Sequence, residues 1–305
     1  MSDMESPLVS VIIPTYGGAE YLKRCVDSVL AQTYPNLEII VVDDNGINTP
    51  NQLKTAKVME EYRNVPSVKY VCHEVNINGS AARNTGVKNS KGEYIALLDD
   101  DDVFFPTNIE EHMKILPNLD DSFALTYCSG IDEFTDTGVK RKMIKTFTGQ
   151  DIYAILMHNV TISSTTICIK RNVWETLGGF DETFKRHQDW EFTARVMAKY
   201  KVYALQHIGY KRYRIQRNNP TDPIVKKEYV MHYLNRLMPI INTLPSNERQ
   251  DVLIKNRFGV CLSYLRKKRY MKFLREYIDI HPGYRGFIFL FQWVSNGFKH
   301  KRYEL

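Results

Sequence analysis

The sequence predicts an α/β fold, in which an open and mostly parallel sheet precedes a helical C-terminal region. Two observations carry this prediction. Short β-branched apolar runs alternate with segments of helical apolar spacing through the first hundred residues. From about residue 223 onward the spacing is helical without an evident strand. We therefore expect two regions, residues 1–220 and residues 221–305.

The first half of the sheet follows from these patterns in order. The run at 9–13 is typical of a buried strand, and the apolar residues between 22 and 30 recur along one helix face. Further strands are expected at 38–42, 68–72 and 94–98, and further helices at 51–63 and 80–89. Short connections between alternating strands and helices imply parallel strands with right-handed crossovers.

The alternation is looser after residue 103. Strands are expected at 124–128, 165–169 and 202–205, with a turn around 135–138 and a helix at 188–199.

Composition narrows the class of protein. A hydrophobic content of 43% with 25% charged residues is ordinary for a folded protein, and the net charge of +6 is modest. The five cysteines are widely separated and form no CxxC pair, which argues against a disulfide framework or a structural zinc site. The N-terminus lacks a basic start with an apolar leader, and no apolar run reaches the ~18 residues of a spanning helix. We expect a cytoplasmic protein, with attachment to the inner face of the membrane left open.

Polar residues follow three of the predicted strands at the point where each strand ends. They are Pro14-Thr15-Tyr16, Asp43-Asp44-Asn45 and the run from Asp99 to Asp102. Ligands of open α/β sheets bind beyond the carboxyl ends of the strands, so these segments are expected to line one site. Four consecutive aspartates repel one another, and a divalent cation such as Mg²⁺ or Mn²⁺ would offset that repulsion.

Each of these features has a plainer alternative. An acidic run is often a solvated loop, and Asp-Asn-Gly is ordinary turn chemistry. Arg83, at the start of a predicted helix where anions are favoured, could equally be a surface arginine. The acidic character of the predicted site makes nucleic acid a poor partner.

Six segments in order resemble the signatures of family 2 inverting glycosyltransferases with the GT-A fold, whose sheet is mixed and Rossmann-like. They are SVIIPTY, SVLAQTYPNLEIIVVDDNG, SAARNTG, KGEYIALLDDDD, LGGFDE and HQDWEF, and they span roughly residues 8–215. The resemblance implies a hexosyltransferase-type enzyme that uses a nucleotide-sugar, usually a UDP-sugar, in the synthesis of surface polysaccharide. The acceptor would be a glycan or a lipid-linked oligosaccharide.

The resemblance also implies roles for individual residues. Pro14, Thr15 and Tyr16 would line the nucleotide, and Asp44 would contact the base. Arg83 and Asn84 would lie near the diphosphate and the donor sugar. The family's DXD motif falls on Asp99, Asp100 and Asp101, with Asp99 and Asp100 at the donor and Asp101 binding Mn²⁺ or Mg²⁺.

The general base is expected at Asp189. The corresponding family motif is usually Glu-Asp, and here it is Gln188-Asp189, so the first acid is replaced and the second is retained. Taken without the family, Asp189 would be an acid favoured by the dipole of a helix N-terminus. The QxxRW segment of processive membrane synthases is absent, which favours the addition of one or a few sugars.

The sequence leaves open two alternative functions and one further kind of partner. A nucleotidyltransferase would show a lysine-containing phosphate loop after the first strand, which SVIIPTYGG lacks. A non-catalytic nucleotide-sugar-binding protein would keep the same acids. Near the C-terminus, an aromatic run with basic flanks between Arg285 and Arg302 suits either an anionic membrane surface or packing on protein, including a second copy of the chain.

Overall fold

The computed structural model describes residues 6–214, 222–280, 283 and 286. Contacts divide the chain into two units. The first comprises residues 1–151 and 161–216, and the second comprises residues 152–160 and 217–305. The sequence prediction placed one boundary near 220, whereas the structure assigns an internal segment to the second unit as well.

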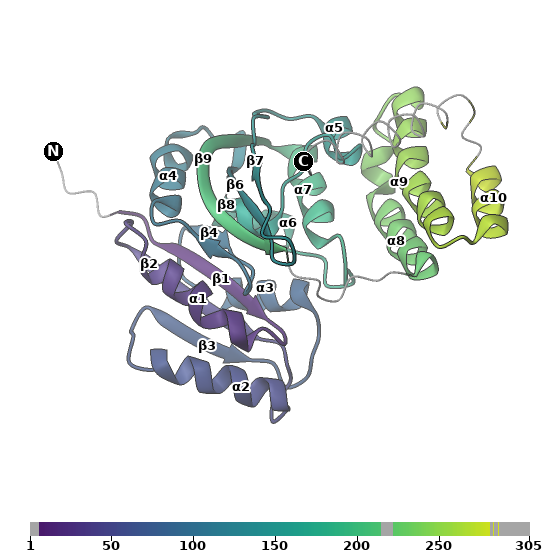
Figure 1. The fold of residues 1–305 in the computed structure, drawn as a ribbon. Coiled ribbons are helices and arrows are strands. Elements are labelled where there is room, and N and C mark those ends of the chain that lie inside the picture. The colour runs from purple at the N-terminus through teal and green to yellow at the C-terminus, as the bar shows by residue number, and fades with distance from the viewer. Residues whose placement is uncertain (1–5, 215–221, 281–282, 284–285, 287–305) are drawn as a thin grey trace. The chain divides into compact units, whose positions relative to one another are not determined.

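The described part of the first unit contains one nine-stranded mixed sheet, in the order β3-β2-β1-β4-β8-β6-β9-β5, with β7 on β6 (Figure 1). The four strands that lead to the predicted site are mutually parallel: β1 (Val9–Thr15), β2 (Leu37–Asp43), β3 (Val68–Cys72) and β4 (Tyr94–Leu97). The remaining strands are β5 (Val103–Phe104), β6 (Phe123–Phe134), β7 (Lys140–Met143), β8 (Ile167–Lys170) and β9 (Lys201–Arg214). β8 is antiparallel to β4, and β6 is parallel to β9.

Helices flank this sheet, and most connect consecutive strands. They are α1 (Ala19–Leu30), α2 (Pro50–Met59), α3 (Gly79–Lys88), α4 (Asn108–Ile115), α6 (Arg171–Leu177) and α7 (Gln188–Lys199). Single turns of 3₁₀ helix cover Glu60–Tyr62, Leu116–Asn118 and Ser164–Thr166. β1 is the centre of the core because it is buried on both faces, and Val11, Ile12 and Ile13 are fully enclosed.

Two strands are longer than their sequence patterns predicted. β6 continues beyond Cys128 to Phe134, and β9 continues beyond Leu205 to Arg214. These extensions are polar, and their charges pair across the strands, with Arg212 on Asp132 and Lys211 on Glu133. Since the expectation was built on apolar runs, strand segments held by charge pairs were missed.

The second unit is helical in its described residues. It contains α5 (Ile152–Leu156), α8 (Pro223–Ile241), α9 (Ser246–Arg266) and α10 (Tyr270–Asp279). Its core includes Leu156, Leu237 and Phe258. Within the described ranges, no helix has the length and apolarity needed to cross a bilayer.

Candidate active site

The carboxyl ends of β1, β2 and β4 are joined by side-chain hydrogen bonds. The Thr15 hydroxyl donates to the Asp100 carboxylate at 2.6 Å, and both residues are buried. The Gly17 amide donates to the Asn45 side-chain oxygen at 2.8 Å. Asp100 packs so closely on Gly18 that a Cβ there would lie 1.8 Å from a carboxylate oxygen. Asp100 therefore organises the base of the site, while Tyr16 is half exposed at its rim.

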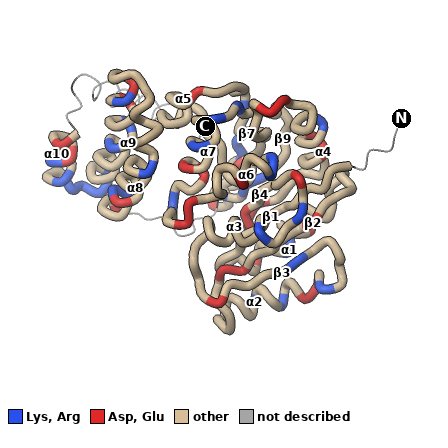
Figure 2. The backbone as a smooth tube through the Cα atoms, turned by 180° about the vertical axis from the view of Figure 1, so that it is seen from behind, with Lys and Arg blue, Asp and Glu red and all other residues tan. Residues whose placement is uncertain are grey.

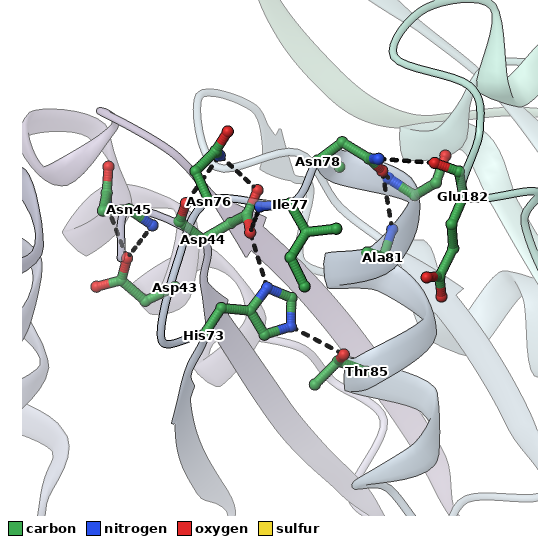
Figure 3. A network of polar contacts seen from close by, with 12 residues as sticks. Asp43, Asp44, Asn45, His73, Asn76, Ile77, Asn78, Ala81, Thr85 and Glu182 are labelled. Carbon is green, nitrogen blue, oxygen red and sulfur yellow. Dashed lines mark hydrogen bonds and ion pairs between the residues drawn. The ribbon is translucent and has the colours of Figure 1, made fainter. Parts of the chain in front are cut away.

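Asp44 is the centre of a buried network at the ends of β2 and β3 (Figure 3). Its carboxylate accepts hydrogen bonds from the Ile77 amide at 2.9 Å and the Asn76 amide group at 2.8 Å. The third contact is with the imidazole of His73, whose Nδ1 lies 2.7 Å from Asp44 Oδ1. The other imidazole nitrogen lies 2.9 Å from the Thr85 hydroxyl on α3. His73 thus fixes the Asp44 carboxylate and links it to the helix that carries Arg83.

The sequence analysis missed His73 although a signal for it was present. His73 directly follows β3, so it obeys the same strand-end rule that selected Thr15, Asp44 and Asp99. A lone histidine among exposed residues carries no motif, and its importance becomes clear only from the contact with Asp44.

Arg83 connects three of the predicted site segments. Its guanidinium donates to Asp99 Oδ1 at 2.5 Å and to Gln188 Oε1 at 2.8 Å, so α3, the acidic run and α7 meet at this side chain. The side chain of Arg83 is 9% exposed, whereas that of Asp99 is 38% exposed. The positive charge of Arg83 is therefore held in place at the bottom of an open acidic site.

Asn84, the neighbour of Arg83, contacts a different element. Its amide group donates to the Phe180 carbonyl oxygen at 2.9 Å, and its side-chain oxygen accepts from the Phe180 amide at 2.9 Å. These bonds hold the loop before α7, where Gly178 and Gly179 both have positive φ angles that favour glycine. In this structure Asn84 positions that loop.

Asp189 lies in the first turn of α7, and this helix is anchored firmly. Buried Glu191 pairs with Arg195, whose guanidinium also donates to the carbonyl oxygens of Leu177 and Gly179. Desolvation of the Asp189 carboxyl group raises its pKa to about 6; the Arg83 charge lowers the pKa and the Asp99 charge raises it. A carboxyl group with this pKa can act as a base near neutral pH.

The acidic run presents its four carboxyl groups to different surroundings. Asp99 and Asp101 are partly exposed, whereas Asp100 and Asp102 are buried. Burial raises the pKa of Asp102 well above its usual range, and the charges of Asp99 and Asp101 raise it further. Asp102 accepts a hydrogen bond from Thr165 at 2.7 Å through Oδ2, while Oδ1 is buried without a hydrogen-bond partner among the described residues.

These donors fit a magnesium or manganese ion. No three His, Cys, Asp or Glu side chains converge on one point within the described residues. Mg²⁺, however, is commonly held by one or two carboxylates together with substrate phosphates and water. The surplus of hard oxygen donors, their mutual repulsion and the unpaired Asp102 oxygen are the conditions that such a cation relieves.

Residues 10–209 match the family described as Glycosyl transferase family 2, and the chain belongs to that family. The resemblance predicted from the six motifs is confirmed.

The chain is also similar in sequence to individual glycosyltransferases. An uncharacterized glycosyltransferase of Methanocaldococcus jannaschii is 30% identical over 245 residues, which cover 76% of this chain and 80% of the relative. An uncharacterized glycosyltransferase of Rickettsia typhi is 34% identical over 204 residues, covering 65% of this chain but only 61% of the relative. The match with a Rickettsia felis protein covers 31% of that relative, so this chain spans only part of several relatives' length.

Solved structures confirm the GT-A fold with its C-terminal helical region. S. aureus TarS 1–349 in complex with UDP-GlcNAc has a TM-score of 0.61 at 18% identity, with 91% of both chains covered. The mannosyltransferase PcManGT of Pyrobaculum calidifontis, in complex with GDP-Man and Mn²⁺, has a TM-score of 0.60 at 17% identity. That comparison covers 86% of this chain and 74% of PcManGT.

Proposed function

We propose that this protein is a metal-dependent inverting glycosyltransferase that moves a sugar from a nucleotide-sugar to an acceptor hydroxyl group. The observation that carries the proposal is the raised pKa of Asp189, about 6, at the start of α7. Gln188, the first residue of this helix, accepts a hydrogen bond from Arg83. The same guanidinium contacts Asp99 of the acidic run. A base and a fixed cation therefore flank one acidic site, which supports transfer from a phosphorylated donor.

The reaction follows from these positions. The Asp189 carboxylate takes the proton from the acceptor hydroxyl as that oxygen forms a bond to the anomeric carbon. The bond between this carbon and the diphosphate oxygen breaks, and its electron pair leaves with the nucleoside diphosphate. Because attack and departure occur on opposite faces, the anomeric configuration inverts. Arg83 stabilises the developing negative charge, and its buried contacts keep it from reorienting.

We assign the cation to Asp101, assisted by the neighbouring carboxylates. When bound, Mn²⁺ or Mg²⁺ would supply positive charge beside the donor diphosphate. Thr15, Pro14 and Tyr16 are assigned to the nucleotide, and Asp44 is assigned to the base. Asp99, Asp100 and Asn84 complete the donor side, with Asp100 and Asn84 acting through the loops that they hold.

A UDP-sugar is the proposed donor, and a binding panel tests both nucleotide and metal. The melting temperature of the full chain is measured with UDP-, GDP- and CDP-sugars, each with and without Mn²⁺. A ligand present at about 100 times its dissociation constant stabilises a protein by about 2.7 kcal/mol. We expect this shift for UDP-sugars with Mn²⁺. Absence of a shift with every donor would overturn the proposal, while donor binding without transfer or hydrolysis would favour the non-catalytic alternative.

We also propose that the protein acts at the cytoplasmic face of a membrane on a glycan or lipid-linked acceptor. The segment between Arg285 and Arg302 that first suggested this lies outside the described residues, apart from Gly286. Support comes instead from α10, where Met271 is 79% exposed, Ile278 is 56% exposed and Leu274 lies between them. Lys267, Lys268, Lys272 and Arg275, just before this ridge or within it in sequence, are also exposed. Figure 2 shows basic residues along the backbone at α10. An apolar ridge with basic flanks matches an anionic bilayer surface.

Vesicle co-sedimentation tests the membrane contact. The full chain is expected to bind vesicles that contain phosphatidylglycerol and to bind neutral vesicles weakly. Replacing both Met271 and Leu274 with Asp should abolish binding, whereas Leu53→Asp, at an exposed apolar residue of α2, should not. Equal and negligible binding to both kinds of vesicle would remove the membrane from the proposal and leave packing on protein, including a second copy, as the role of this ridge.

A further inference from the structure

A cluster of cationic side chains lies on the ends of β6 and β9, outside the residues assigned to the donor. Arg212 donates to the Asp132 carboxylate at 2.9 Å through Nε and at 3.2 Å through Nη2. Arg214 donates to the same carboxylate at 2.8 Å. Asp132 is buried, whereas the Arg214 side chain is 44% exposed. Two guanidinium groups therefore share one carboxylate, and one of them faces solvent.

Lys145 adds a third positive charge to this cluster. Its ammonium group donates to the Thr161 carbonyl oxygen at 2.7 Å and to the Thr161 hydroxyl at 3.2 Å, both of which are neutral acceptors. Burial lowers the pKa of Lys145, as do the nearby charges of Arg212 and Arg214, whereas the Asp132 carboxylate raises it. Arg212 donates to the Ser163 hydroxyl at 3.3 Å, so Lys145 and Arg212 both bind the short segment 161–163.

Strand register places the cluster beside the acidic run. Val103, the residue after Asp102, pairs with Lys211 in the antiparallel contact of β5 with β9, so Arg212 lies across from Asp102. On the other side of β9, Arg212 pairs with Asp132. Burial and the charges of Asp99 and Asp101 raise the pKa of Asp102, and the charge of Arg212 lowers it. The cations thus border the proposed reaction site on the side away from β1 and β2.

The charges in this cluster do not balance. Among the described residues, three cations, Lys145, Arg212 and Arg214, pair with or act on the single carboxylate of Asp132. Glu133 does not correct the difference, because it lies on the opposite face of β6 and pairs with Lys211. A purely structural network would be expected to match its charges more closely.

The buried hydroxyl group of Tyr210 is a second indication that an anion binds here. Tyr210 is fully enclosed, and its hydroxyl has no hydrogen-bond partner in the part of the chain that the structure describes. Its ring centroid is 5.8 Å from the Arg212 guanidinium, and burial raises the pKa of its hydroxyl group well above the usual range. A buried hydroxyl group without a hydrogen-bond partner is unusual in a protein interior. An anionic oxygen bound near these cations would accept its hydrogen bond.

We infer that this cluster is an acceptor subsite for an anionic group, so that the acceptor carries a phosphate or a carboxylate group. Lys145 and Arg214 bind the anion, and Arg212, held by Asp132, positions them beside the acidic run. This inference rests on the proposed glycosyl transfer, since it names the chemical class of the acceptor for that reaction.

Chemical labelling of Lys145 tests the anion site without requiring turnover. A lysine with a lowered pKa is readily acetylated, and mass spectrometry reports the extent of acetylation at each lysine. We expect glycerol 1-phosphate or glucuronate to slow acetylation of Lys145 severalfold relative to sodium chloride of equal ionic strength, while glycerol and glucose have no effect. Lys142, which is exposed on β7, should be labelled equally in all conditions. Protection by the phosphate alone or by the carboxylate alone identifies the anion.

Transfer assays on the full chain then connect the site to the reaction. Phosphorylated or carboxylated acceptors are compared with their neutral counterparts at saturating donor. Lys145→Gln and Arg214→Gln should raise KM for the anionic acceptor, relative to the neutral one, by about 10–100-fold, as expected for loss of a charge-assisted hydrogen bond. Lys142→Gln should leave this ratio unchanged.

The two proposals fail in different ways. If the donor is bound and turned over but no anion protects Lys145 and no variant changes the acceptor ratio, the anionic subsite is wrong and the transferase function stands. If anions protect Lys145 but no nucleotide-sugar is bound or consumed, the subsite stands and the proposed reaction is wrong.

Discussion

Gln188 is a neutral residue at the position where the resemblance leads us to expect glutamate. Its side-chain oxygen accepts a hydrogen bond from Arg83, so the geometry of the contact is kept without a second negative charge. Arg83 then has only Asp99 as its ionic partner among the described contacts. In the proposed reaction, more of the guanidinium charge would be available to the donor diphosphate, and less negative charge surrounds Asp189.

Restoring the acid at position 188 should change the pH dependence of transfer. Gln188→Glu adds a negative charge next to Asp189, so the pKa of Asp189 should rise above its present value of about 6. The acidic limb of kcat/KM should move upward by about one pH unit. A pH–rate profile measures the shift, and Gln188→Met, which removes the hydrogen bond without adding charge, is the control. An unchanged limb in Gln188→Glu would show that Asp189 does not set it.

Asp189→Asn tests the base directly. The variant keeps the side-chain oxygen that accepts from the Trp190 amide but cannot take a proton, so donor binding should persist. Turnover should fall by about 10²–10⁴-fold, the usual contribution of a general base. Donor binding is measured by thermal shift and transfer by product formation. Near-normal transfer by this variant would refute the assignment.

The same variant should be more stable than the parent near neutral pH. Because the folded-state pKa of Asp189 is raised from 3.8 to about 6, the unfolded chain releases this proton more readily. Ionisation therefore destabilises the fold as the pH rises above the unfolded value, by at most about 3 kcal/mol once the pH exceeds the folded value. Melting temperatures should differ little at about pH 3 and most above about pH 6. A constant difference at all pH values would contradict this linkage.

At the scale of the elements, α3 determines where Arg83 lies relative to the sheet. Gly86, one turn after Arg83, allows the helix to approach β1 closely. A Cβ at Gly86 would lie 2.3 Å from Ile12 Cγ2 and 3.3 Å from Val42 Cγ2, in the densest part of the core. The contact of α3 with the sheet therefore depends on the absence of one side chain.

Gly86→Ala should displace α3 from β1. The substitution is expected to cost about 1–3 kcal/mol, typical of overpacking in a core, although alanine is the better helix former. Movement of the helix should also carry Arg83 away from Asp99 and raise KM for the donor. Urea unfolding and donor kinetics measure the two effects, with Lys88→Ala on the exposed side of α3 as the control. A variant as stable and active as the parent would show that the helix can shift freely.

The strength of sequence-based prediction differed between the two halves of the sheet. The range 68–72 agrees with β3 as observed, because that strand is rich in β-branched and aromatic residues and is bounded by turns. The ends of β6 and β9 were missed because Asp132, Arg212 and Arg214 are stabilised by pairing with residues distant in sequence. Site residues that carry motifs, such as Arg83 and Asp189, could be selected early. His73 and Lys145 act only through tertiary neighbours, which periodicity does not reveal.

At the scale of the whole molecule, the chain contributes to its second unit twice. Residues 152–160 leave the sheet unit and pack in the helical unit before the chain returns at 161. Within that unit the Tyr153 hydroxyl lies 3.2 Å from Asp251, and Ile155 and Leu156 are buried. Cutting the chain near 216 would therefore leave an apolar segment without its partners, so the two units are not separable by a single truncation.

Asn256 on α9 is the polar residue that binds this internal segment. Its amide group donates to the Leu156 carbonyl oxygen at 3.1 Å, and its side-chain oxygen accepts from His158 at 2.9 Å. Asn256→Ala would remove both hydrogen bonds, and loss of the donor to the buried Leu156 carbonyl oxygen should cost about 1–3 kcal/mol. Hydrogen exchange should accelerate in residues 152–160 and in α9 while β1 stays protected, and Asn247→Ala, exposed on the same helix, should change neither. Equal acceleration in β1 would mean that the segment and the sheet unfold together, and that the second unit is not an independent source of stability.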